Sequence, residues 1–129
     1  MTNILLFHIQ TNEKRRKIKT AAVMLRLSCR EVPSEEFGRT LGALAGLMEA
    51  ENSAPEILEP FTDEMLVMNG LAGPVFQQFL NTLRRQKAVV TLKAVITEQN
   101  AQWTCVQLHQ AIADEHAAMQ KGLKSFHKG

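Results

Sequence analysis

Short apolar runs alternate along the chain with longer segments in which apolar residues recur every three or four positions. Such runs are typical of buried strands, and such spacing is typical of helices that pack one face on a core. The pattern predicts strands over residues 3–9, 27–32, 65–68 and 88–95, and helices over 13–26, 34–48, 73–87 and, from a cap at Thr97 or Asn100, up to 121.

Alternation of strands and helices favours an α/β layered domain. We expect one domain over residues 1–122, with a mainly parallel four-stranded sheet and about four helices, followed by a flexible tail over 123–129. A split ferredoxin-like α+β arrangement is the alternative. We find no internal repeat.

Residues 64–95 form the clearest unit of this pattern. The strand over 65–68 is broken by Asn69-Gly70, and Gly73-Pro74 reads as a helix start with proline at the first helical position. A β-branched strand over 88–95 follows the helix. The sequence therefore predicts a βαβ unit here.

Three glycines and a long connection mark the middle of the chain. Gly38, Gly42 and Gly46 recur every four residues, which weakens a helix and allows close backbone packing. Residues 49–63 are acidic and contain two prolines, so we expect a long loop that is mobile or takes part in an interaction.

Composition narrows the class of protein. The chain has 129 residues, of which 45% are hydrophobic and 22% charged, as in a soluble globular domain. No apolar run is long enough to span a bilayer, and the first residues lack the features of a signal peptide. Two cysteines without paired-site spacing favour a reduced, cytoplasmic protein.

Charge is segregated although the net charge is only +2. Residues 13–30 contain seven basic residues against one acidic, and residues 31–64 contain nine acidic against one basic. One interpretation is that two solvated faces complement each other within the fold or across a dimer. The other is nucleic-acid binding by the basic helix, which lacks aromatic stacking residues and any recognised motif.

In an open parallel sheet, ligands bind beyond the carboxyl ends of the strands. Those ends carry His8, then Asn69, Gly70 and Gly73, and we predict a ligand site from these four residues. The glycine loop at a helix start suits a small anion, although Pro74 removes one N–H and the spacing matches no nucleotide-binding pattern. Ordinary turn chemistry explains the same residues.

The last predicted helix carries Cys105, His109, Glu115 and His116. Cys105 and His109 lie four apart, which permits a metal pair or an activated thiol. His109 and His116 lie about 10 Å apart along the axis, so one metal cannot bind both. A buried thiol, a boundary histidine and a solvated Glu115–His116 pair explain these residues equally well. We therefore predict no catalytic residue, no metal and no cofactor.

Several segments resemble a family of small bacterial proteins catalogued only as a domain of unknown function. They are residues 61–70 and 92–97, with Asn100, Trp103 and the pair Glu115-His116. Leu71 departs from the family, in which an aromatic residue is more usual. The resemblance implies a stand-alone bacterial cytoplasmic protein and no particular catalytic residues.

These observations leave three hypotheses of function. The first is a protein-interaction or regulatory domain that binds a partner protein or copies of itself and does not associate with a membrane. The second is a sensor or minor enzyme that binds a small anion or metabolite at the strand ends. The third is nucleic-acid binding through residues 14–19, which the sequence favours least.

Overall fold

The computed structural model describes residues 2–49, 54–57 and 60–128 and shows one four-stranded sheet. The strands lie in the order β2-β1-β3-β4. β1 pairs parallel with β2, β3 pairs parallel with β4, and the central β1–β3 pair is antiparallel. The predicted α/β domain with a mainly parallel sheet is confirmed, and the ferredoxin-like alternative is not found. The strands are β1 Ile4–Phe7, β2 Cys29–Glu31, β3 Met65–Met68 and β4 Leu92–Val95.

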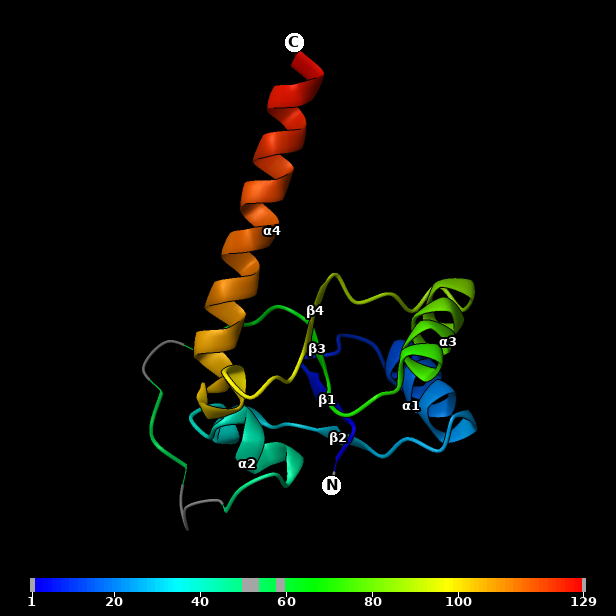
Figure 1. The fold of residues 1–129 in the computed structure, drawn as a ribbon, viewed down its shortest axis with the longest axis vertical. Helices are drawn as coiled ribbons and strands as arrows, with labels where there is room; N and C mark the ends of the chain where they lie inside the picture. Colours follow the sequence, from blue (N-terminus) through cyan, green and yellow to red (C-terminus); the bar gives the residue numbers. More distant parts are fainter. Residues whose placement is uncertain (1, 50–53, 58–59, 129) are drawn as a thin grey trace.

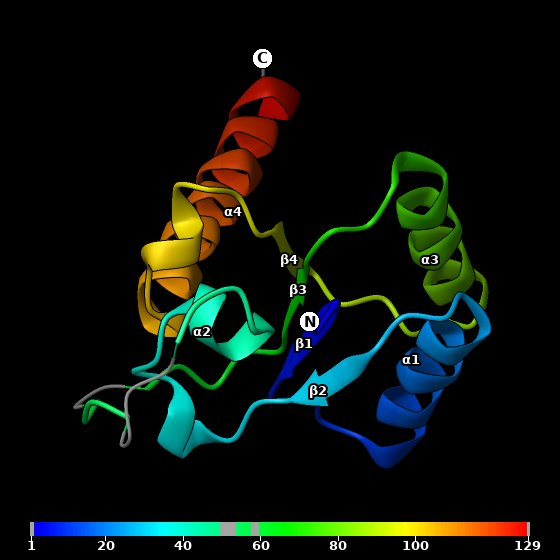
Figure 2. The ribbon, with the colours of Figure 1, turned by 60° about the horizontal axis from the view of Figure 1, so that its bottom comes forward.

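Helices cover both faces of the sheet (Figure 1). α1 and α3 lie side by side on one face, and α2 and α4 lie on the other (Figure 2). Short 3₁₀ turns precede α2 and α4. The bounds are α1 Asn12–Met24, η1 Ser34–Glu36, α2 Leu41–Ala45, α3 Gly73–Arg85, η2 Asn100–Gln102 and α4 Cys105–Lys128.

The central strands β1 and β3 have buried side chains on both faces, so the domain has two apolar cores. Ile4 and Leu6 point to the α1/α3 layer, and Leu5 and Phe7 point to the α2/α4 layer. This two-sided burial is why β1 and β3 read as continuous apolar runs in the sequence.

Several predicted boundaries differ from the structure. Gly38 and Gly42 pack closely, as expected: a Cβ on Gly38 would clash with the Pro55 carbonyl oxygen. The helix expected over 34–48 is instead divided into η1 and α2, and α2 ends where Gly46 adopts φ 82°. α4 continues through Gly122 to Lys128, so the end predicted at Gly122 is wrong. Flexibility of residues 123–129 stays a prediction.

The two halves of the chain repeat one β-α-β-3₁₀-helix unit around an approximate twofold axis. A half-turn about the Leu5–Val67 pair exchanges β1 with β3. Thr40 and Thr104 form an antiparallel bridge with each other, and each hydroxyl caps the helix that follows it. The sequence shows no internal repeat, so the correspondence of the two halves lies in the arrangement of their elements.

The ends of α1 and α3 confirm this correspondence. After α1, Arg26 has φ 60°, and the N–H of Leu27 donates to the carbonyl of Ala22. After α3, Lys87 has φ 56°, and the N–H of Ala88 donates to the carbonyl of Leu83. Both are Schellman ends with a non-glycine residue in the left-handed position. Ala88 therefore belongs to a helix end, which is why the strand predicted over 88–95 is shorter.

Candidate functional site

The predicted site residues lie at two opposite edges of the sheet. Because β1 and β3 are antiparallel, His8 follows β1 at one edge and faces Glu64, while Asn69 follows β3 at the other edge and faces Asn3. The expectation that one edge gathers His8 with Asn69, Gly70 and Gly73 is wrong. It assumed that β1 and β3 run in the same direction.

The Asn69 edge is closed by hydrogen bonds to the start of the chain. The N–H of Asn69 donates to the Asn3 carbonyl (2.7 Å), and the Asn3 side chain donates to the Asn69 carbonyl (3.0 Å). The buried Asn69 amide donates to the Thr2 carbonyl (3.2 Å). Gly70 adopts φ 70°, and Gly73 lies in open surroundings. These contacts explain the Asn-Gly sequence as turn chemistry.

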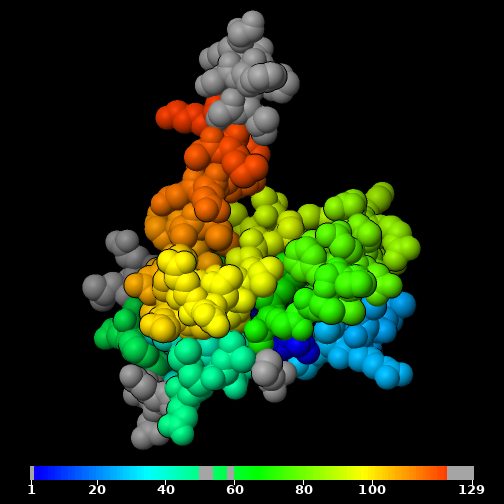
Figure 3. All heavy atoms as spheres, viewed as in Figure 1, coloured from blue at the N-terminus to red at the C-terminus, as the bar shows by residue number. Residues whose placement is uncertain are grey.

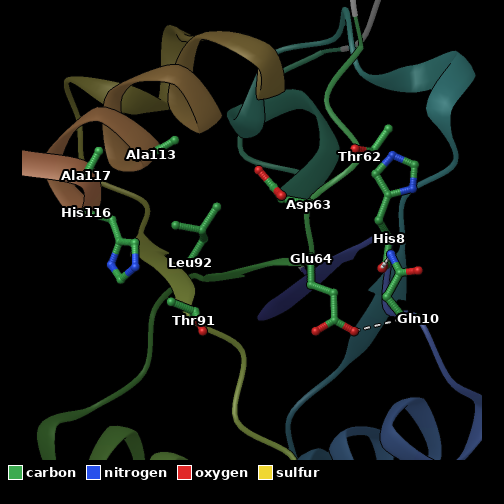
Figure 4. Close-up of a pocket in the computed structure, with 10 residues that line it drawn as sticks. All are labelled: His8, Gln10, Thr62, Asp63, Glu64, Thr91, Leu92, Ala113, His116 and Ala117. Carbon is green, nitrogen blue, oxygen red and sulfur yellow. Dashed lines mark hydrogen bonds between the residues drawn. The ribbon is translucent and has the colours of Figure 1, made fainter. Parts of the chain in front are cut away.

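The His8 edge instead opens into a cleft of about 890 Å³ (Figure 4). It lies between the middle of α4, the segments that enter β3 and β4, and the residues that follow β1. Its polar and apolar walls are formed by His8, Gln10, Thr62, Asp63, Glu64, Thr91, Leu92, Ala113, His116 and Ala117.

His8 adopts φ 54°, a conformation that costs an L-residue about 1–2 kcal/mol. The same twofold axis relates His8 to Gly70, which has the left-handed conformation without that cost. The His8 ring contacts Phe37 (5.1 Å between centroids) and Phe61 (5.7 Å) edge-on, which fixes its orientation. Its Nε2 atom is buried and has no hydrogen-bond partner within the part of the chain that the structure describes. An unsatisfied buried nitrogen requires an explanation.

Two carboxylates enter the cleft just before β3. Glu64 accepts hydrogen bonds from the Gln10 N–H (2.7 Å) and from the Lys14 ammonium group (2.5 Å). Asp63 contacts Nε2 of His109 (2.9 Å), whose ring stacks on Phe61 with centroids 4.2 Å apart. Sequence reasoning missed both carboxylates because they precede a strand. Only the antiparallel β1–β3 pairing brings that end beside His8.

The thiol–imidazole pair considered for α4 is not formed. Cys105 is fully buried, and this burial raises its pKa to about 12. Its side chain approaches the Arg39 carbonyl, while His109 turns toward Asp63. Burial also raises the pKa of Cys29 to about 11. Both thiols are therefore protonated and weak nucleophiles near neutral pH.

His116 lines the cleft, whereas its neighbour Glu115 is exposed. Among the side chains that the structure describes, which end at residue 121, no group of three or more histidine, cysteine, aspartate or glutamate side chains could hold a metal ion.

Part of the segregated charge is neutralised within the fold. Basic residues of α1 and β2 form ion pairs with acidic residues of the following segments: Lys14–Glu64, Arg15–Glu31, Lys19–Glu31 and Arg30–Glu36. These pairs match the interpretation of two complementary faces in one domain. They weaken the case for a basic helix that binds nucleic acid.

Residues 64–119 match the model of a family described as "Domain of unknown function (DUF3783)". This agrees with the predicted resemblance to a family catalogued only by that description. The match begins just before β3 and ends within α4, so it covers most of the second structural repeat. No curated protein and no solved structure matches the chain. In the described residues, no helix combines the length and the apolar character needed to cross a membrane.

Proposed function

We propose that this protein is a small regulatory domain that binds a small polar metabolite in the His8 cleft. The observation that carries the proposal is the state of His8 itself. An imidazole occupies a left-handed backbone position that is glycine in the related half, and its buried Nε2 has no partner among the described residues. Strain and unsatisfied polar atoms of this kind concentrate at ligand sites.

The surroundings of His8 support the same proposal. The cleft combines an apolar wall with a few convergent polar groups, as small-molecule sites do. Phe37 and Phe61 hold the imidazole in place before any ligand arrives, which lowers the entropic cost of binding.

A thermal-unfolding screen against small metabolites tests this proposal, with His8→Gly as the matched variant. A ligand at a hundred times its dissociation constant stabilises the native state by about 2.7 kcal/mol, a shift of several degrees for a domain of this size. We expect at least one metabolite to raise the unfolding temperature of the natural protein and not of the variant. A ligand that stabilises both proteins equally would place the site elsewhere, and a screen without any hit would count against the proposal.

Self-association through α4 is a second candidate function. Beyond the turns that line the cleft and up to residue 121, α4 projects from the rest of the molecule (Figure 3), whereas α2, its structural equivalent, has only 5 residues. Cys105 and Leu108 pack on the core, and Met119, on the same side of the helix, is 66% exposed. A helix without tertiary contacts is only marginally stable in water, so a second copy that covers this stripe would stabilise it.

Mass in solution at low and high salt tests the second candidate. We expect a dimer that persists at high salt, because apolar burial is not screened by ions. Met119→Lys should produce monomers, whereas Met24→Lys, at a similarly exposed methionine of α1, should not. A strict monomer at all protein concentrations, or equal dissociation by both substitutions, would contradict this candidate.

A further inference from the structure

We infer that the ligand of the His8 cleft is an aliphatic amine whose ammonium group binds Asp63 and whose second polar group reaches His8. This inference rests on the proposed function and names the chemical class of the metabolite.

The balance of charge in the cleft favours a cation. Glu64 is 18% exposed and is already neutralised by Lys14. Asp63 is 63% exposed, and its contact with His109 is an ion pair only while that imidazole is protonated. Of the two carboxylates of the cleft, Asp63 is therefore the one that no lysine or arginine pairs with in the described residues. A ligand ammonium group would form a charge-assisted hydrogen bond with it.

The wall opposite the carboxylates accommodates hydrocarbon. Leu92 at the start of β4 and the small side chains Ala113 and Ala117 of α4 line this side (Figure 4). Methylene groups of a ligand would bury apolar area against them. A molecule with polar groups at both ends and an aliphatic middle matches this distribution.

His8 supplies the second polar contact. Two rings connect His8 with Asp63: the His8 ring contacts Phe61 edge-on, Phe61 stacks on the His109 ring, and His109 contacts Asp63. In the tautomer protonated at Nδ1, the unpartnered Nε2 of His8 accepts a hydrogen bond. An N–H or O–H donor at the second polar end of the ligand would satisfy this atom.

Calorimetric titration of the full chain with three probes of similar length tests the inference. The probes are putrescine, which carries an ammonium group at each end, its neutral counterpart butanediol, and its dianionic counterpart succinate. We expect putrescine to bind at least about tenfold more tightly than butanediol, because one charge-assisted hydrogen bond adds that much. We expect no measurable binding of succinate.

Two variants separate ligand binding from support of the cleft. Asp63→Asn should weaken putrescine binding about tenfold or more, because the amide lacks the charge. His109→Phe removes the other partner of Asp63 and retains a ring on Phe61, so it should leave putrescine binding intact or strengthen it. Circular dichroism of each variant checks that the fold is retained.

Three results would overturn the amine inference. They are binding of succinate in preference to putrescine, equal putrescine affinity in the natural protein and Asp63→Asn, and no binding of any of the three probes. If a different metabolite binds and His8→Gly abolishes its binding, the proposed function stands and only the chemical class is wrong.

Discussion

The two edges of the sheet are built from equivalent residues of the two halves, yet they differ in chemistry. At one edge, Asn69 and Gly70 close the turn after β3 with amide hydrogen bonds and a glycine in the left-handed conformation. At the other, His8 takes that conformation and Glu64 reaches across to the chain that follows β1. One edge is sealed, and the other opens into a cleft.

This difference indicates that an imidazole at the His8 position costs the fold some stability, which the glycine of the equivalent position does not. The shared unit needs a left-handed residue after the strand, and glycine meets that need at no steric cost. An imidazole at the same place costs free energy and leaves Nε2 unsatisfied among the described residues. Local rules that fail in one of two equivalent sites point to function at the site where they fail.

The largest expected effect concerns Cys105, which begins α4 where the equivalent α2 begins with Leu41. Burial raises the pKa of Cys105 from 9.0 to about 12. Above about pH 9 the unfolded thiol loses its proton and the folded one keeps it. The contribution of Cys105 to the free energy of unfolding should therefore fall by about 1.4 kcal/mol per pH unit as the pH rises from about 9 toward 12.

Urea unfolding at a series of alkaline pH values measures this slope. Cys105→Ala should remove the contribution of Cys105 and leave that of Cys29, which spans a narrower pH range because its pKa is raised only to about 11. An unchanged slope in the variant would show that the loss of stability arises elsewhere, and that the two halves do not differ in this respect.

Substitutions at His8 and Gly70, the equivalent left-handed positions of the two halves, should change the free energy of unfolding less, and by different amounts at the two positions. Gly70→Ala should lower the free energy of unfolding by about 1–2 kcal/mol, because φ 70° is strained for alanine. His8→Gly should change it by less than about 1 kcal/mol, since relief of strain offsets the loss of ring contacts and the entropy of glycine. Urea unfolding of both variants checks this. A large loss of stability in His8→Gly would mean that His8 is structural.

The smallest effect should be the same in both halves. Arg26→Gly and Lys87→Gly each place glycine in the left-handed position of a Schellman end, and each should raise the free energy of unfolding by about 0.5–1 kcal/mol. Thermal unfolding of the two variants measures it. A gain in one half and a loss in the other would break the structural equivalence of the halves.

Much of the fold could be predicted from the sequence because local signals were strong. The end of β3 and the start of α3 were predicted correctly, because Asn69-Gly70 ends the strand and Gly73-Pro74 begins the helix. The repeat could not be found in this way. Arg26 and Lys87 take a conformation typical of glycine, so the shared helix ends carry no common residue signal.

The candidate site could be predicted only in part. His8 was identified as a strand-end residue, but Asp63 and Glu64 were not. β1 and β3 are apolar on both faces, so nothing in their residues specifies whether they pair parallel or antiparallel. That single choice decides which polar residues share an edge with His8.

Amide NMR spectra of the labelled protein, recorded with and without a pool of small polar metabolites, test the central claim most directly, because they report both edges at once. The account predicts that shifted resonances belong to residues of the His8 cleft, among them Gln10, Asp63, Glu64 and Thr91, while Asn69 and Gly70 stay unperturbed. Shifts centred on Asn69 and Gly70, or no shifts at all, would contradict it.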